Sequence, residues 1–522
     1  MKADQHRSRK IFGYHCRMAQ RFAHNTAYST IAGLIMSLGR FATTIAMARI
    51  LGVDATGVAA FALWITSLIC AVTSLGVYAT LTRYLPELRS NEDGAQRMAR
   101  LLLLPYAGTA LFVATVSVAV YESNFLHLAN ILANVFVTAD VNLIVALYVI
   151  QSLATFGLGY IIGQQRFRDF ALVAAISNLL QLVIVIVAGS KWGVNGVLFG
   201  YIAGWLPFTF ICARLRFGKI GVPEQLRNRV LKFTVFSWAS TLANELVWAR
   251  LEMAFLGHFW GNGAIGLYSI GFTLASLATQ GPLLLTGGLL PYFAEAISSN
   301  QHGRAKVRLQ TAMRLVAFFV LPMCFGVAAL IPDLLPLMYG DSFAQGSLSA
   351  IILVSSAGLG ANVVVPFAFI NGMERSDFLF VLNIVGAILS FVLGLALVSS
   401  MGIVGAALAR AAVQVYVLST SLWFLRRRLD CQVPLVHLGS ICISALAGAF
   451  VAGLIVSRIP GLPGLVLSVP MAALVYILLV RLLGAIPDED IESLQALFAH
   501  VPPPLKRGTA LALSVILGDR RH

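Results

Sequence analysis

The chain has 522 residues, of which 58% are hydrophobic and only 11% are charged, and its mean hydropathy is +0.84. Soluble domains carry about 25% charged residues, so this composition excludes an ordinary soluble enzyme. The 37 Lys and Arg residues against 22 Asp and Glu leave a formal net charge of +15. Because long apolar runs separate these charges, a lipid bilayer explains the basic character better than nucleic acid does.

Apolar segments of about 20 residues, the length that crosses a bilayer, recur along the chain. They predict an all-α polytopic membrane protein with about fourteen transmembrane helices. The first six are expected near residues 29–50, 56–79, 98–121, 140–163, 169–188 and 194–213. The next six are expected near 233–256, 263–287, 311–331, 347–370, 377–398 and 402–424, and the last two near 437–457 and 462–483. Segment 122–139 is too short in its apolar part to cross and is expected to form an external or interfacial loop.

The distribution of Lys and Arg predicts the orientation in the membrane. Cationic residues crowd the N-terminal arm and the even-numbered loops, ending with the run Arg426–Arg428, whereas the odd-numbered loops contain only Lys191 and Arg458. By the positive-inside rule both termini are cytoplasmic. The first apolar run is too long and begins too late for a cleaved signal peptide. The six cysteines and nine histidines have no ligand spacing, so neither a metal site nor a cofactor is expected.

Short patterns recur at nearly constant spacing in the two halves. Gly52 and Gly257, Asp169 and Asp377, and Gly193 and Gly402 lie 205, 208 and 209 residues apart. A repeat of about 207 residues that holds six spans predicts two six-helix lobes related by a pseudo-twofold axis along the membrane normal, plus two C-terminal helices. The alternative is that small residues mark the span ends of any membrane protein. The expected parts are a cytoplasmic basic arm at 1–28, a first lobe at 29–215, a cytoplasmic linker at 216–232, a second lobe at 233–425, a helix pair at 426–484 and a cytoplasmic tail at 485–522. Within the tail, residues 488–498 are expected to form an interfacial amphipathic helix.

Charges inside spans are costly and therefore face a cavity or a partner. Arg40 and Glu245 lie near mid-span and 205 residues apart, which makes them equivalent in the repeat. The polar residues expected beside them, from helical spacing, are Ser37 and Thr44 on the first span, Asn244 and Glu252 on the seventh, and Thr273 and Gln280 on the eighth. These stripes predict a polar central cavity. The alternative is a structural ion pair between Arg40 and Glu245, with hydroxyls that bond only between helices.

Other arginines remain ambiguous. Arg49 lies nine residues beyond Arg40, on the opposite helical face, which favours a snorkelling or interfacial position. Arg410 fits either an anchor or a pathway. Arg83 follows the second span, and Arg250 lies on the seventh.

The sequence lacks the motifs of several enzyme classes. It contains no Gly-x-x-x-x-Gly-Lys-[Ser/Thr], Gly-x-Ser-x-Gly or His-Glu-x-x-His pattern. The expected external loops are too short to hold an active site, which disfavours an integral-membrane polysaccharide polymerase. The chain is therefore not expected to be an enzyme.

Several short pieces of the sequence carry a family resemblance. The pieces that carry it are Ala48-Arg49-Ile50-Leu51-Gly52, Arg83-Tyr84-Leu85-Pro86-Glu87, Arg250-Leu251-Glu252 and Gly402-Ile403-Val404-Gly405-Ala406. Over about 25–480 the chain resembles the polysaccharide transporter family, the O-antigen-type flippases of lipid-linked oligosaccharides, in the multidrug/oligosaccharidyl-lipid/polysaccharide exporter superfamily. Family members often carry an aspartate where Glu252 stands here. The resemblance implies two lobes around a cavity lined by the first, second, seventh and eighth spans.

The resemblance also implies the function. The cargo would be a polyprenyl-diphosphate-linked oligosaccharide, flipped from the cytoplasmic to the external leaflet of a bacterial inner membrane for cell-surface polysaccharide synthesis. Arg40, with Arg250, would engage the diphosphate or an acidic sugar, and Glu245 and Glu252 would couple transport to a proton or cation. Membrane lipids and glycan-assembly proteins are the expected partners, and nucleic acid is not. The alternative within the superfamily is a drug or metabolite antiporter.

Overall fold

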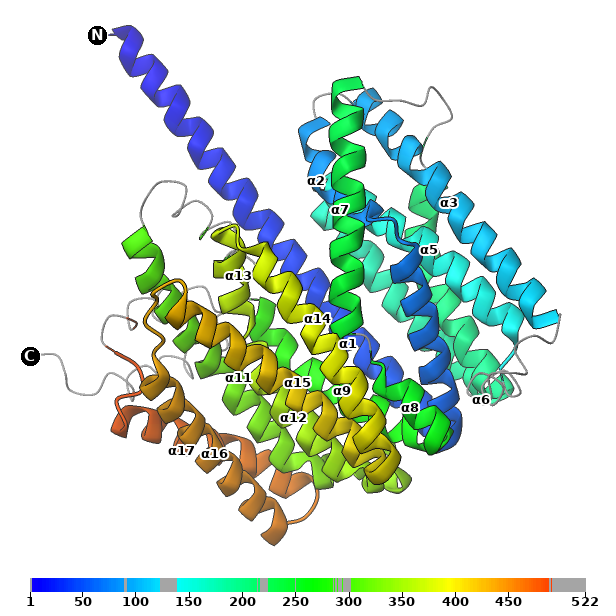
Figure 1. Ribbon diagram of the computed structural model, residues 1–522, viewed down its shortest axis with the longest axis vertical. Coiled ribbons are helices and arrows are strands. Elements are labelled where there is room, and N and C mark those ends of the chain that lie inside the picture. The colour runs from blue at the N-terminus through cyan, green and yellow to red at the C-terminus, as the bar shows by residue number, and fades with distance from the viewer. Residues whose placement is uncertain are drawn as a thin grey trace, which may run out of the picture. The chain divides into compact units, whose positions relative to one another are not determined.

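The computed structural model describes residues 2–88, 92–122, 139–213, 224–248, 250–284 and 302–487, together with 215, 286, 289, 293 and 490. Throughout this part of the chain the regular elements are helices, as predicted (Figure 1). The chain divides into two compact units, Met1–Glu245 and Leu246–His522. The predicted loop at 122–139 falls almost wholly outside the described residues, as does the predicted amphipathic helix of the tail.

Most helices of the first unit are long, and two glycines break the helical path. Its helices are α1 (Lys2–Thr73), α2 (Val77–Tyr84), α3 (Glu92–Glu122), α5 (Val141–Gly163), α6 (Phe167–Ala213) and α7 (Glu224–Trp248). Gly52 in α1 (φ 74°, ψ −176°) and Gly193 in α6 (φ 57°, ψ −130°) adopt conformations that side chains disfavour. Each of these two helices therefore comprises two consecutive segments.

The second unit has more helices, and most are shorter. They are α8 (Glu252–Phe259), α9 (Asn262–Leu284), α11 (His302–Tyr339), α12 (Ser347–Ala361), α13 (Val364–Gly372), α14 (Ser376–Leu393), α15 (Ser399–Arg427), α16 (Leu435–Arg458) and α17 (Leu462–Leu482). A π-helical turn, Gly394–Val398, joins α14 to α15. Gly402 breaks α15 with φ 57° and ψ −131°.

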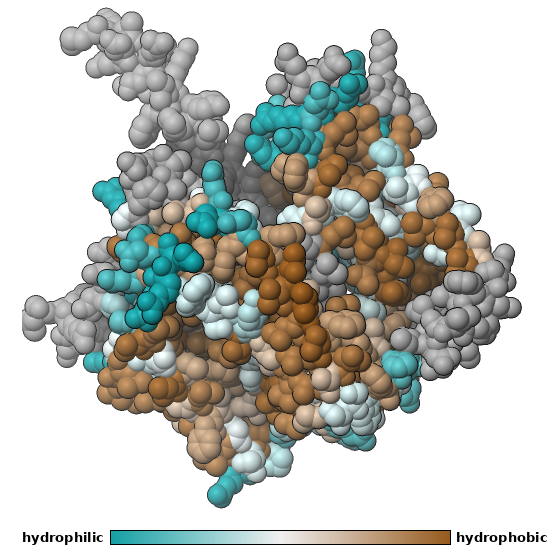
Figure 2. All heavy atoms as spheres, viewed as in Figure 1, coloured by the Kyte–Doolittle hydropathy of each residue, from teal (hydrophilic) through white to brown (hydrophobic). Residues whose placement is uncertain are grey.

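Within the described residues nine helices are long and apolar enough to cross a membrane. Three of them, Thr30–Thr73, Phe167–Cys212 and Ser376–Arg427, have 44, 46 and 52 residues, about twice the length that one crossing needs. Each contains one of the three glycine breaks. Large apolar side chains are exposed along α14, including Phe380, Ile388 and Phe391, and apolar residues cover this helix in Figure 2. Such a surface suits lipid rather than water, and the chain is a multi-pass membrane protein.

The backbone of the two units repeats at a constant spacing. Positive φ angles occur at Gly52 and Gly261, at Gln165 and Glu374, and at Gly193 and Gly402, each pair 209 residues apart. The helix-ending bonds from the Arg166 amide to the Ile161 carbonyl and from the Arg375 amide to the Ile370 carbonyl share this spacing. An internal repeat is thereby confirmed.

This register differs from one expected match. The equivalence of Arg40 and Glu245 lies before the break between α7 and α8, where no described positive-φ pair tests the spacing, and it stays a prediction. The sequence comparison had matched Gly52 with Gly257. The glycine that shares its left-handed conformation is Gly261, about one helical turn later.

The predicted seventh span is also interrupted. We expected one helix over 233–256, but α7 ends at Trp248 and α8 begins at Glu252. Helical spacing does not continue through the break, so the face predicted to be shared by Glu245 and Glu252 is wrong. Glu252 instead lies in the first turn of α8, where a carboxylate interacts favourably with the helix dipole.

The C-terminal helices α16 and α17 pack on α11 within the second unit. Their contact includes Phe318, Ile441 and Tyr476, and the Tyr476 hydroxyl donates a hydrogen bond to the Phe318 carbonyl at 2.8 Å. Beyond α17, Asp490 forms a buried ion pair with Arg314 of α11. The end of the described chain is thereby fastened to α11.

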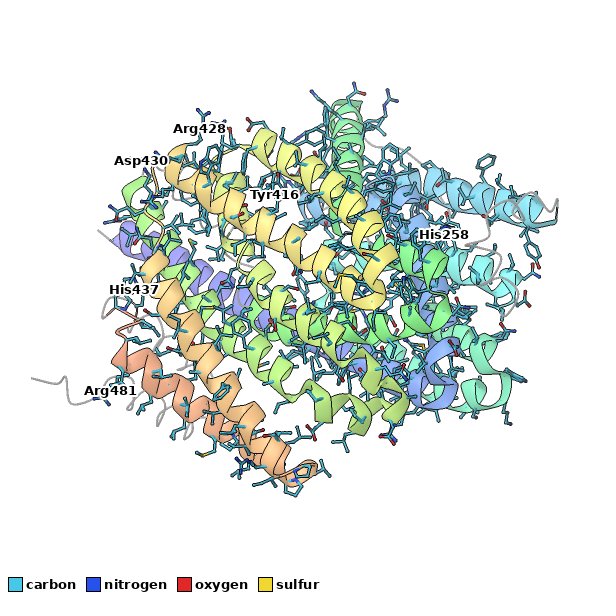
Figure 3. All side chains as sticks on the ribbon, turned by 60° about the horizontal axis from the view of Figure 1, so that its bottom comes forward. His258, Tyr416, Arg428, Asp430, His437 and Arg481 are labelled. Carbon is cyan, nitrogen blue, oxygen red and sulfur yellow. The ribbon has the colours of Figure 1, made fainter. Side chains whose placement is uncertain are left out.

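Several polar and charged residues of the second unit lie toward one end of its helices. Arg428, Asp430, His437 and Arg481 lie toward this end, whereas His258 of α8 lies away from it (Figure 3). Lys306 at the start of α11 donates a hydrogen bond to the Asp430 carbonyl at 2.8 Å.

Candidate functional site

In the first unit, Arg40 is exposed on α1 beside a tight helix contact. A Cβ atom added at the neighbouring Gly39 would collide with the side chain of Asn178 on α6. The next residue, Arg40, lies about 100° further round the helix and therefore off this contact. Arg40 is accordingly exposed, and Ser37 is half-buried.

Thr44 lies one turn after Arg40 but is buried. Its hydroxyl donates to the Arg40 carbonyl at 2.9 Å. This bond within the helix leaves only the lone pairs of the hydroxyl oxygen for another partner. Of the polar stripe predicted on this span, Arg40 is therefore the side chain best placed to meet a solute.

The second unit contains a buried charged cluster. Glu252 of α8 is 0% exposed, and Arg410 of α15 is 4% exposed. The Glu252 carboxylate interacts electrostatically with the Arg410 guanidinium first and with the Arg250 guanidinium second. Because burying one charge without a partner is expensive, this opposite-charge arrangement is what allows both to lie inside an apolar bundle.

Two hydroxyl groups complete this cluster. Ser390 of α14 and Tyr268 of α9 lie beside the Glu252 carboxylate. Neither Glu252 oxygen, nor the Ser390 hydroxyl, nor the Tyr268 hydroxyl completes a well-aligned hydrogen bond to any residue that the structure describes. Buried polar groups are rarely left in that state, so these four oxygen atoms form a site with unused hydrogen-bonding capacity.

The two arginines of the cluster also share an aromatic ring. The Arg250 guanidinium carbon lies 3.9 Å from the centroid of Phe272, and that of Arg410 lies 5.6 Å from it. Both distances are within the range of a cation–π interaction. The cluster thus holds two guanidinium groups and one carboxylate.

The remaining predicted site residues are not part of this cluster. The Thr273 hydroxyl donates to the Ser269 carbonyl at 2.8 Å, and Gln280 and Arg49 are exposed. Arg83 forms a surface ion pair with Glu87 at 2.9 Å. Glu245 is partly buried and is the last residue of the first unit along the chain. The side chain of Asn244 lies outside the described residues.

The structure thus brings together Arg250, Glu252 and Arg410 among the predicted residues. Sequence reasoning missed Tyr268, Phe272 and Ser390 as members of the cluster. Tyr268 follows Gly266 and Leu267, but nothing in the sequence placed it near Glu252. No group of three or more His, Cys, Asp or Glu that could hold a metal occurs among the described residues.

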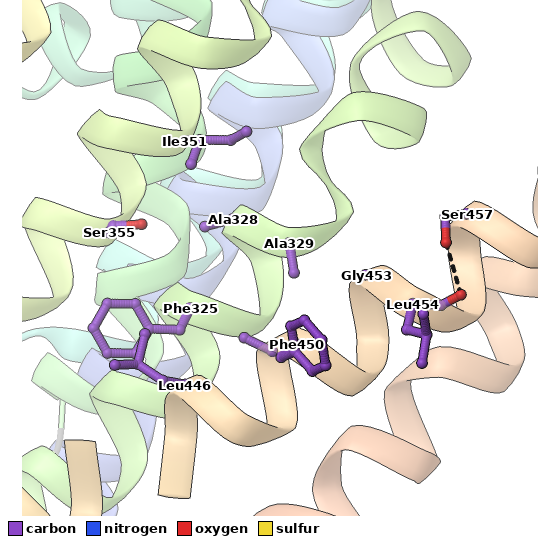
Figure 4. Close-up of a pocket in the computed structure, with 11 residues that line it drawn as sticks. Phe325, Ala328, Ala329, Ile351, Ser355, Leu446, Phe450, Gly453, Leu454 and Ser457 are labelled. Atoms are coloured by element: carbon purple, nitrogen blue, oxygen red, sulfur yellow. Dashed lines mark hydrogen bonds between the residues drawn. The ribbon is translucent and has the colours of Figure 1, made fainter. Parts of the chain in front are cut away.

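A separate cavity of about 530 Å³ lies among α11, α12 and α16 (Figure 4). The apolar side chains that line it include Phe325, Ile351 and Phe450. The hydroxyl of Ser457 at one edge donates to the Leu454 carbonyl at 2.9 Å. The lining carries no charged side chain, so this cavity offers nothing to an anionic headgroup.

A helical membrane bundle with charges buried inside one unit is a feature that transporters often share. Solved structures share the fold of this chain. The lipid II flippase MurJ superposes with a TM-score of 0.69 over 88% of this chain and 98% of its own, at 14% identity. A multidrug resistance MATE family transporter of the MOP superfamily superposes with a TM-score of 0.58 over 76% and 94%, at 12% identity.

Sequence comparisons show the family of the chain. The chain belongs to the polysaccharide biosynthesis protein family, whose sequence model matches residues 46–348. The probable flippase AglR of Haloferax volcanii is 19% identical over 62% of this chain and 67% of its own. Stage V sporulation protein B of Bacillus subtilis is 20% identical over 73% and 82%. The match to the probable low-salt glycan biosynthesis flippase Agl15 of H. volcanii, at 19% identity, spans 35% of this chain and 38% of that protein.

Proposed function

We propose that this protein flips a polyprenyl-diphosphate-linked oligosaccharide from the cytoplasmic to the external leaflet of a bacterial inner membrane, for cell-surface polysaccharide synthesis. Its family and the flippases among its relatives support this substrate class. The observation that carries the proposal is the set of charges kept inside an apolar helical protein. Such charges are expensive and mark transport pathways or the elements that drive them.

Arg40 is the proposed contact for the diphosphate or for an acidic sugar. It is cationic, exposed, and lies on the first span of the first unit. Arginine suits this role because its planar guanidinium can donate two parallel hydrogen bonds to a phosphate. Ser37, Thr273, Gln280, Asn244 and Arg250 are proposed to line the rest of the substrate path.

Glu252 and Glu245 are the proposed coupling or gating residues, driven by a proton or a cation. The buried Glu252 cluster supports this role, because its unused oxygens can take up a positive species that changes the charge of the site. The proposed mechanism is alternating access through a cationic cavity between two six-helix lobes, residues 29–215 and 233–425. Residues 216–232 would link the lobes, and residues 426–484 would form the C-terminal helix pair. Cytoplasmic termini are proposed from the positive-inside pattern.

The test is a deletion strain scored in two ways. Loss of the gene is expected to cause lipid-linked oligosaccharide to accumulate and surface polysaccharide to disappear, and plasmid-borne wild type restores both. Arg40→Ala and Glu245→Gln are expected to restore neither, whereas Arg458→Ala, an exposed arginine outside the proposed path, restores both. Wild-type export in both path variants would refute the assigned roles.

The same strain distinguishes the main alternative. A MATE-like fold is shared by drug antiporters, so drug hypersensitivity without any change in lipid-linked oligosaccharide would favour a drug or metabolite antiporter. That result would refute the flippase proposal.

A further inference from the structure

We propose that the Arg410 guanidinium serves as the counter-charge of the buried Glu252 carboxylate and thereby prevents alkali metal ions from binding there. This inference rests on the proposed coupling role of Glu252 and narrows it. Arg410 would be a specificity-determining residue, because it decides which positive species the second unit accepts. Three features of the cluster carry the argument.

The first feature is the donor set. Two Glu252 oxygens, the Tyr268 hydroxyl and the Ser390 hydroxyl face one another in the interior, and none completes a well-aligned hydrogen bond within the described residues. Carboxylate and hydroxyl oxygens are the ligands of hard cations. Taken alone, this group of oxygens would suit an ion such as Na⁺.

The second feature is the charge already beside those oxygens. Arg410 is the strongest electrostatic partner of Glu252 and is 4% exposed, so water screens it little. A monovalent ion held about 5 Å from a guanidinium, at an effective dielectric constant of about 20, is disfavoured on the order of 100-fold. The guanidinium neutralises the carboxylate and repels a second cation at the same time.

The third feature distinguishes Arg410 from Arg250. Arg250 stacks at 3.9 Å on Phe272 and lies in the break between α7 and α8, partly exposed. Arg410 lies farther from that ring, at 5.6 Å, and is the deeper of the two. Among the described residues, Glu252 also faces the Tyr268 hydroxyl from α9 and the Ser390 hydroxyl from α14, in addition to Arg410 from α15. Removing Arg410 therefore leaves the oxygens in place and removes their main counter-charge.

The experiment uses the purified full-length protein in lipid nanodiscs. Binding of ²²Na⁺ and the thermal unfolding temperature are measured in NaCl, KCl and choline chloride at equal ionic strength. The wild type is expected to bind no Na⁺ and to unfold at the same temperature in all three salts. Arg410→Gln, which substitutes a neutral side chain with an amide oxygen, is expected to bind Na⁺ and to unfold at least about 2 °C higher in NaCl than in choline chloride.

Matched variants test whether the Na⁺ binding expected of Arg410→Gln comes from the Glu252 cluster. Arg49→Gln removes an exposed arginine and is expected to behave as the wild type does. Arg410→Gln combined with Glu252→Gln is expected to lose the acquired Na⁺ binding, because the carboxylate ligand is gone. If Arg410→Gln fails to fold while the double variant folds, the failure supports Arg410 as the counter-charge that Glu252 requires.

Two results would overturn the inference. One is saturable Na⁺ or K⁺ binding by the wild type that Glu252→Gln abolishes. The other is a well-folded Arg410→Gln variant that binds no alkali ion. Both measurements are independent of transport, so they are distinguishable from a failure of the flippase proposal, which the deletion strain would reveal.

Discussion

Removing the buried carboxylate of Asp490 is expected to destabilise the second unit strongly. In the structure this carboxylate receives hydrogen bonds from Arg314 Nε at 2.5 Å and Nη2 at 3.0 Å, and from the Thr311 hydroxyl at 2.7 Å. The side chains of Arg314 and Asp490 are 6% and 0% exposed. Breaking such a pair costs about 3–5 kcal/mol, because a buried guanidinium is left uncompensated. Asp490→Ala should therefore lower the unfolding temperature substantially.

The assay is thermal unfolding of detergent-solubilised protein, followed by size-exclusion chromatography of the remaining folded fraction. The matched control is Asp377→Ala, because Asp377 pairs with Arg375 at 3.2 Å while both side chains are exposed. Exposed pairs contribute at most about 1 kcal/mol. The double replacement Arg314→Met with Asp490→Leu should recover much of the loss, since no unpaired charge remains. If Asp490→Ala unfolded at the same temperature as the Asp377→Ala control, the reasoning would be refuted.

Three further predictions follow from other residues. Arg40→Ala should reduce export in the complemented deletion strain about 10-fold or more, since a charge-assisted hydrogen bond contributes about 1.5–3 kcal/mol. Arg40→Lys should retain part of the export, because it keeps the positive charge. Equal export by both variants would contradict a charge contact. Gly402→Ala should destabilise the protein by about 1–3 kcal/mol, because the backbone at this position has a positive φ. The control Gly326→Ala, where a helical glycine has open space around it, should be neutral or stabilising. Equal unfolding temperatures for the two variants would count against backbone strain at Gly402. Burial raises the pKa of the Cys431 thiol in the loop after α15. Maleimide labelling of a Cys431-only variant should therefore be slower in the folded protein at pH 8 than after unfolding, and equal labelling rates in the two states would contradict this. The contribution of this thiol to stability should be lost as the pH rises above the ordinary thiol pKa.

The sequence alone determined the membrane class, the repeat and the family resemblance of this protein. These properties depend on local features that need no tertiary contact to be recognised. Apolar length identifies a span because every span must cross the same hydrocarbon thickness. Gly193 and Gly402 were recognised as equivalent because a left-handed backbone favours glycine wherever it occurs.

Only the tertiary structure decided which charges meet. Glu252, Tyr268, Ser390 and Arg410 come from four helices, and no spacing in the sequence connects them. The break after Trp248 also invalidated the helical arithmetic that had placed Glu245 and Glu252 on one face.

The same limit applies to the C-terminal pair of charges. Arg314 and Asp490 are 176 residues apart, and Asp490 lies in the segment of the tail that was predicted to form an interfacial amphipathic helix. Periodicity reports which face of a helix is apolar, whereas burial of a charge depends on which other helix covers that face. That choice is made by packing across the whole unit, and the candidate site follows from it.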